Sequence, residues 1–251
     1  MISKRRVKNL SELLLQSHFS GAMIALDPAV ELDGVDEAYW VQEAVLRGLD
    51  PRRPMSWKIA PPRDGGEPRS SPTPCKAAKP SPAEFTSVNR VLGVEAEIAF
   101  RFASAPPLKG RKPDIVGAIE KAFVLIELCE TRFYNVDEVA PLLRLADFQS
   151  HGGFAFGTGI ADWRKLDFAR QPVELLVNGK SVASRTGSHP TGDPFALAEW
   201  AVKHCAARGM PLAAGDVVTT GTWTGMTPIA AGDEVVAKFE GIGSATLKLA
   251  S

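Results

Sequence analysis

The sequence predicts an α+β fold in which a small helical N-terminal part precedes a rolled or closed β-structure. Apolar residues recur at helical spacing in two segments before residue 50. Residues 94–102 instead alternate in polarity with a period of two, which is typical of a strand. After residue 170, short apolar segments are separated by turn residues such as those at 214–216 and 231–233. Many short strands at such spacing favour a closed or rolled sheet.

Two helices are predicted near the N-terminus. The first covers residues 7–16, which contain Leu10, Leu13, Leu14 and Leu15. The second begins at Asp36, whose side chain can cap it, and ends at Gly48, where a left-handed C-cap residue belongs. We expect the two helices to form one small subdomain.

A proline-rich segment follows them. Residues 51–82 hold nine of the chain's 19 prolines, and we expect no regular element there because proline lacks a backbone N–H. Long irregular segments in compact domains are either functional lids or disordered insertions, and the sequence leaves both open. Since the segment contains Lys58, we expect it to act as a lid beside the site.

The later elements follow from periodicity and turn chemistry. Asn178-Gly179 predicts a type I′ turn because both central residues need positive φ. Asp193 can cap a helix that Gly209 ends. The predicted strands are residues 94–102, 122–129, 173–177, 181–184, 217–220, 234–239 and 244–249, and a short helix is predicted at 113–121.

Composition narrows the class of partner. Lys plus Arg and Asp plus Glu both number 29, so no strong field would attract nucleic acid or an anionic membrane, and we expect a small-molecule partner. The three cysteines are far apart in sequence and form no disulfide pattern, which is expected of a protein in a reducing compartment. The sequence shows no secretion signal or apolar run of spanning length, so we expect a cytoplasmic protein.

Three glutamates are candidate metal ligands. Glu95 and Glu97 leave the same face of a predicted strand, roughly 6.5 to 7 Å apart. This pair fits either a solvated face or a shared cation. Glu127 lies within an apolar strand, where an unpaired carboxylate is costly. Its partner is either a hard divalent cation, Mg²⁺ or Mn²⁺ rather than zinc, or a basic group such as Arg132.

Other chemistry has weaker signals. Lys58 lies between Trp57 and Ile59, so partial desolvation could lower its pKa, although most lysines are solvated surface groups. Residues 219–225 place hydroxyls and glycines between strands, as anion-binding turns do, but such turns are also common without ligands. The histidines show no metal-ligand spacing, and the sequence contains no nucleotide-binding or serine-hydrolase signature.

Four segments occur in a characteristic order. They are residues 93–100 (GVEAEIAF), Ile126-Glu127 with Thr131-Arg132, Ala146-Asp147 through Ser150 and Gly152, and residues 214–225 (AGDVVTTGTWTG). Together they resemble the 2-keto-4-pentenoate hydratase family of the fumarylacetoacetate hydrolase superfamily, which includes 4-oxalocrotonate decarboxylases. The resemblance runs from about residue 90 to the C-terminus and more loosely through the N-terminal helices.

This resemblance implies a mixed β-roll or barrel core and a Mg²⁺ or Mn²⁺ site. Glu95 and Glu97 match the family's two-carboxylate motif, and Glu127 matches its third metal-binding carboxylate. We therefore divide the chain into an N-terminal helical part with a lid-like segment, residues 1–84, and a β-roll catalytic domain, residues 85–251.

The resemblance also implies residues for acid/base chemistry and substrate binding. Lys58 matches the family's acid/base lysine, and Glu84 is the candidate for its acidic partner. Ser150 matches a polar substrate-pocket position, while Gly221 and Thr222 match the loop that holds the substrate carboxylate.

The chain departs from the family pattern at three places. Ala60 replaces a glycine, residues 61–82 replace a regular segment, and Phe148-Gln149 replaces asparagine and alanine. An aromatic residue at position 148 would narrow the substrate pocket.

The family implies a metal-dependent lyase of aromatic catabolism. The leading hypothesis is hydration of 2-hydroxypenta-2,4-dienoate (2-keto-4-pentenoate) to 4-hydroxy-2-oxopentanoate. The alternatives are decarboxylation of a 4-oxalocrotonate-type 2-oxo diacid, hydrolysis of an acylpyruvate, or a non-catalytic role. We expect a homo-oligomer that binds a small 2-oxo acid and neither nucleic acid nor membrane.

Overall fold

The computed structural model describes residues 2–26, 30–62, 65–108 and 115–251. Its helices are α1 (Ile2–Ser20), α2 (Val35–Leu49), α3 (Pro141–Ala146) and α4 (Phe195–Ala207). Its strands are β1 (Ser56–Ala60), β2 (Arg69–Thr73), β3 (Ala78–Pro80), β4 (Ala83–Phe85), β5 (Arg90–Phe102), β6 (Ile119–Thr131), β7 (His151–Ile160), β8 (Pro172–Val177), β9 (Lys180–Thr186), β10 (Val217–Thr222), β11 (Glu234–Phe239) and β12 (Gly243–Leu249).

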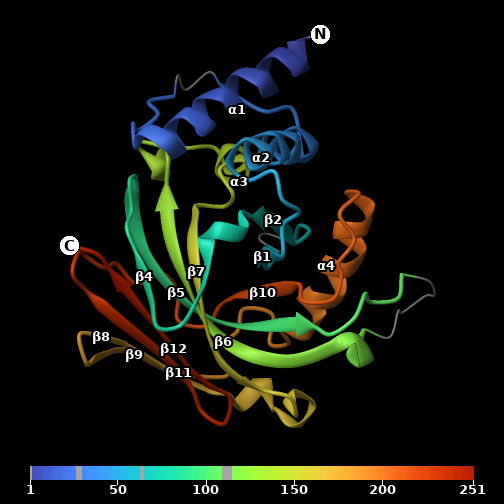
Figure 1. The fold of residues 1–251 in the computed structure, drawn as a ribbon, viewed down its shortest axis with the longest axis vertical. Coiled ribbons are helices and arrows are strands. Elements are labelled where there is room, and N and C mark those ends of the chain that lie inside the picture. The colour runs from blue at the N-terminus through green and yellow to red at the C-terminus, as the bar shows by residue number, and fades with distance from the viewer. Residues whose placement is uncertain (1, 27–29, 63–64, 109–114) are drawn as a thin grey trace.

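The strands form two sheets that share the main core. The seven-stranded sheet has the order β2-β1-β10-β5-β6-β7-β3, and the five-stranded sheet has the order β4-β12-β11-β8-β9. The large sheet is curled, with α1, α2 and α3 packed together at one end and α4 along one side (Figure 1). Buried residues of both sheets and of α4 form one apolar cluster, while the N-terminal helices bury a second cluster with α3. The predicted α+β fold with a rolled sheet is therefore confirmed.

The second N-terminal helix differs from the prediction at both ends. It begins at Val35, so Asp36 lies in its first turn rather than at the cap. Gly48 lies inside the helix and is not a left-handed cap, because the C-cap is Asp50 in an extended conformation. A Cβ on Gly48 would lie 2.6 Å from a methyl carbon of Leu15. The glycine therefore allows α1 to approach α2 closely. In the sequence alone, a glycine required for this packing looks the same as one that ends a helix.

The proline-rich segment is not irregular, and that prediction is wrong. It contains β1, β2 and β3, and β1 pairs in parallel with β10 inside the large sheet. The prolines are tolerated because Pro54 and Pro61 flank β1, while Pro72 and Pro80 lie on the two edge strands of this sheet. The large sheet thus includes strands from before and after residue 84, and β4 of the other sheet spans that position. The domain division there stays a prediction.

Two further elements depart from the sequence prediction. Of the helix predicted at residues 113–121, positions 113 and 114 lie outside the described residues, Val116–Ala118 form a 3₁₀ turn, and β6 already begins at Ile119. The strand predicted at 94–102 was expected to be half-buried, but its second face is also covered, since Ala99 packs with Phe123 and Leu125. Glu97 is consequently fully buried.

The predicted C-terminal hairpin is confirmed. Asn178 and Gly179 have φ of 50° and 76° and connect β8 to β9. The predicted cap of α4 is displaced by one residue, because its N-cap is Pro194 rather than Asp193. The Asp193 side chain still accepts a hydrogen bond from the backbone N–H of Phe195 (2.9 Å). Within the described residues, no helix has both the length and the apolar composition needed to cross a bilayer.

Gly159 lies where β6 and β7 pack closely, so a substitution at this position tests the fold. A Cβ there would lie 2.2 Å from the carbonyl oxygen of Ala122. We expect Gly159→Ala to lower the free energy of unfolding by about 1–3 kcal/mol, as overpacking does. Thermal and urea unfolding would measure the loss. The matched control is Gly117→Ala, whose Cβ would meet no atom within 4 Å; equal stability of the two variants would contradict the packing argument.

Candidate functional site

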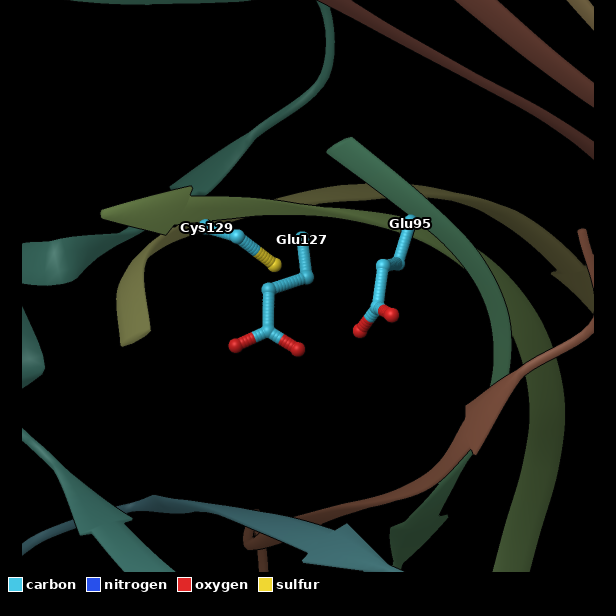
Figure 2. A group of neighbouring side chains, drawn as sticks. All are labelled: Glu95, Glu127 and Cys129. Carbon is cyan, nitrogen blue, oxygen red and sulfur yellow. The ribbon is translucent and has the colours of Figure 1, made fainter. Parts of the chain in front are cut away.

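The site forms where β5 and β6 run side by side. Their antiparallel register places Glu95 directly opposite Glu127. The two carboxylates project into the same space from neighbouring strands (Figure 2). Glu97, two residues along β5, is fully buried, and one of its oxygens accepts a hydrogen bond from the backbone N–H of Gly221 (2.9 Å). The structure therefore brings all three predicted carboxylates to one region of the large sheet.

Lys58 reaches this region from β1. Its Nζ lies 3.0 Å from Oε1 of Glu127 and donates to the carbonyl oxygen of Gln149 at 3.0 Å. Arg132, the basic partner considered from the sequence, instead pairs with Asp147, whose Oδ1 lies 2.5 Å from its Nε. The buried Glu127 thus has a lysine counter-ion that comes from the proline-rich segment.

Burial and neighbouring charges shift the pKa values of Lys58, Glu127 and Glu97. Burial alone would lower the pKa of Lys58, but the nearby charge of Glu127 outweighs it and raises that pKa. The expected lowering of this pKa is therefore wrong. Burial alone would raise the pKa of Glu127, but Lys58 and a hydrogen bond from His151 hold it below its ordinary value. Burial, together with the charges of Glu127 and Glu95, raises the pKa of Glu97 well above its usual range.

Several buried polar atoms at the site have no hydrogen-bond partner. They are Oε1 of Glu97, Oε2 of Glu127 and Nε2 of His151. Buried carboxylate oxygens normally have a partner, so unpartnered ones indicate a place for a water or an ion. Carboxylate oxygens are the donors that Mg²⁺ and Mn²⁺ prefer. The donor set therefore fits a hard divalent cation.

Cys129 was not considered as a ligand in the sequence analysis. One ligand-capable atom from each of Glu95, Glu127 and Cys129 lies within 4.8 Å of the others, a group that does not include Glu97 (Figure 2). The sequence could have indicated Cys129 as a neighbour of Glu127, because residues two apart on a strand lie on the same face. Burial raises the pKa of the Cys129 thiol well above its ordinary value. A neutral thiol is a poor donor to Mg²⁺, so the carboxylates are the better ligands.

A left-handed turn leads from α3 into β7. Phe148, Gln149 and Ser150 have φ of 50°, 55° and 61°, values that are uncommon for residues other than glycine. This conformation costs free energy and often occurs at functional sites. It places the Gln149 carbonyl within hydrogen-bond distance of Lys58 Nζ, and Ser150, the next residue, is half-buried. The role of Ser150 in substrate binding stays a prediction.

Phe148 does not narrow the pocket, contrary to expectation. Its side chain belongs to the apolar cluster of the N-terminal helices and lies edge-on to His18 of α1, with ring centroids 5.9 Å apart.

The substrate-binding residues predicted on β10 lie beside Glu97. Thr222 is opposite Glu97 in the strand register, and Gly221 has φ of 88°. A Cβ on Gly221 would lie 2.9 Å from Pro61, so the glycine allows both the turn and the approach of its N–H to Glu97. Their role in holding a substrate carboxylate stays a prediction.

Glu84 does not join the other predicted residues. It lies on β4 in the five-stranded sheet, opposite Lys248, and its side chain is exposed. Its predicted acid/base role has no support from this position.

Residues 75–250 match the fumarylacetoacetate (FAA) hydrolase C-terminal family. The chain belongs to this family. It is 29% identical over 155 residues to 2-hydroxyhexa-2,4-dienoate hydratase from Comamonas testosteroni, and 25% identical over 158 residues to 4-oxalocrotonate decarboxylase from Pseudomonas putida. These alignments cover 61% and 62% of this chain but only 58% and 59% of the two relatives.

A solved structure has the same fold along nearly the whole chain of this FAA hydrolase family member. The 4-oxalocrotonate decarboxylase from Pseudomonas putida G7, complexed with magnesium and adipate, superposes with a TM-score of 0.86 at 22% identity, covering 98% of both chains. The expected family resemblance and the fold it implied are confirmed.

The buried carboxyl of Glu97 leads to a pH-dependent prediction for the cation-free protein. Because its pKa is raised in the folded state, the folded protein binds this proton more tightly than the unfolded chain does. Glu97 therefore lowers the free energy of unfolding progressively as pH rises above its unfolded pKa of roughly 4.3. We expect Glu97→Gln in EDTA to melt at a higher temperature than the natural protein at pH 7, with the gap closing near pH 4. A variant that melts lower at pH 7 would contradict this.

Proposed function

We propose that this family member is an enzyme that acts on a small unsaturated 2-oxo acid with the help of a divalent cation. The observation that carries the proposal is the pair of buried, unpartnered carboxylate oxygens on Glu97 and Glu127, next to the ammonium of Lys58. Glu95, Glu97 and Glu127 would hold Mg²⁺ or Mn²⁺. When bound, such an ion would act as a Lewis acid toward a 2-oxo acid and stabilise negative charge that develops on it.

Lys58 is the residue we assign to proton transfer. In the cation-free site its Nζ holds a proton firmly, because Glu127 raises its pKa. Lys58 would lose part of this stabilisation when Glu127 shares its charge with a cation, so its pKa would fall toward the range useful for proton transfer. The Gln149 carbonyl accepts a hydrogen bond from the same Nζ and would keep it oriented.

Among the reactions open to such a site, we favour hydration of 2-hydroxypenta-2,4-dienoate. Curated relatives named as hydratases are 27–32% identical, against 25–26% for those named as decarboxylases. In a hydration, Lys58 would deliver or remove a proton while Gly221 and Thr222 orient the substrate carboxylate. Decarboxylation of a 2-oxo diacid is the second candidate, favoured by the end-to-end structural similarity to 4-oxalocrotonate decarboxylase. The homo-oligomeric state stays a prediction.

A substrate panel tests the proposed function. We expect turnover of short unsaturated 2-oxo acids with Mg²⁺ or Mn²⁺, loss of turnover in EDTA, and recovery when the ion is restored. Release of CO₂ from a 2-oxo diacid would identify the decarboxylase, and its absence alongside hydration would identify the hydratase.

The same preparation gives a cation-binding measurement. Mg²⁺ should raise the melting temperature of the natural protein, because a ligand that binds only the folded state stabilises it. Glu127→Gln should abolish the rise, whereas Glu234→Gln, an exposed residue on β11, should retain it. If calorimetry finds no Mg²⁺ or Mn²⁺ binding and EDTA leaves turnover intact, the metal-dependent function is wrong.

Lys58→Met separates proton transfer from cation binding. Methionine fills a similar volume without a charge, so we expect turnover to fall by roughly 10²- to 10⁴-fold. Mg²⁺ affinity should hold or increase, because the variant removes a positive charge that competes for Glu127. A large loss of Mg²⁺ affinity would instead show that Lys58 maintains the geometry of the carboxylates.

A further inference from the structure

The two oxygens of Glu127 have different surroundings. Oε1 lies 2.9 Å from Nδ1 of His151 and 3.0 Å from Nζ of Lys58. Oε2 is buried and has no hydrogen-bond partner. One oxygen is thus held by the protein, while the other remains open to a ligand.

His151 is itself held firmly at the start of β7. The residue is 3% exposed, and its ring packs against Phe154 with centroids 4.3 Å apart. Its carbonyl oxygen accepts a hydrogen bond from Nη1 of Arg132 at 3.0 Å, and its backbone N–H donates to the carbonyl of Phe148 at 3.2 Å. Contacts of both backbone and ring therefore fix where Nδ1 lies.

The chemistry of His151 and Glu127 determines which of the two donates the hydrogen bond. A carboxylate can only accept, so Nδ1 is the donor to Glu127 and the neutral ring leaves Nε2 as an acceptor. His151 can therefore orient Glu127 through this hydrogen bond to Oε1.

Lys58 is a poorer candidate for this orienting task. Its Nζ is shared between Glu127 and the carbonyl oxygen of Gln149, and the proposed function assigns its proton to the substrate. We propose that His151 is a positioning residue, which holds Oε1 of Glu127 so that Oε2 faces the divalent cation. This inference rests on the proposed function. Hydrogen bonds that orient metal ligands typically contribute 10- to 100-fold to metal affinity.

Two substitutions at one position test the proposal. His151→Asn keeps an N–H donor close to the place of Nδ1, whereas His151→Leu fills volume without a donor. We expect Mn²⁺ affinity, measured by calorimetry and by electron paramagnetic resonance of the bound ion, to fall by about 10- to 100-fold in His151→Leu. His151→Asn should restore most of the affinity.

A core variant in the five-stranded sheet controls for general destabilisation. Val235→Ala opens a cavity in β11 within the main core and should lower the melting temperature while leaving Mn²⁺ affinity unchanged. Natural Mn²⁺ affinity in His151→Leu, or an equal loss in His151→Asn, would overturn the positioning role while leaving the proposed function intact. If the natural protein binds no Mn²⁺ or Mg²⁺, the proposed function fails and the positioning role fails with it.

Discussion

Negative charge buried between β5 and β6 is the constraint on which the site depends. Glu97 and Glu127 are both fully buried, and Glu95 lies directly opposite Glu127. Burying ionised carboxylates costs several kcal/mol each unless a partner offsets the loss of water. Lys58 offsets one of these charges, and the raised pKa of Glu97 shows a second way to limit the cost. A divalent cation would offset the charges without requiring that carboxyl to stay protonated.

This constraint explains why the proline-rich segment is part of the large sheet. Lys58 must reach Glu127 from a rigid position, and β1 provides one because it pairs with β10 on one side and with β2 on the other. The register of β10 with β5 shifts between Thr219 and Thr222, next to the left-handed Gly221. That irregularity turns the Gly221 N–H toward Glu97, so the backbone of β10 also stabilises a buried carboxyl.

The sequence predicted those parts of the fold that local patterns encode. Polarity of period two located β5, and Asn178-Gly179 located the β8–β9 hairpin. Prolines concealed β1 and β2, because only tertiary pairing shows that these residues lie at strand ends and on a sheet edge. The three candidate carboxylates were visible in the sequence. Their surroundings were not, since Lys58 reaches Glu127 from β1, and the pairing that brings His151 of β7 next to Glu127 is tertiary.

The left-handed turn before β7 connects the helical layer to these charges. The hydroxyl oxygen of Ser71 on β2 accepts from the side-chain amides of both Gln42 on α2 (2.9 Å) and Gln149 in the turn (3.0 Å), and the Gln149 carbonyl accepts from Lys58. Three hydrogen bonds thus join α2 to the lysine. The strained backbone at Gln149 persists because its side chain and its carbonyl are held by different strands. The packing of α2 on β2 therefore helps to fix the acceptor that keeps Lys58 oriented, which makes the N-terminal helices part of the site's architecture although they bury a separate apolar cluster.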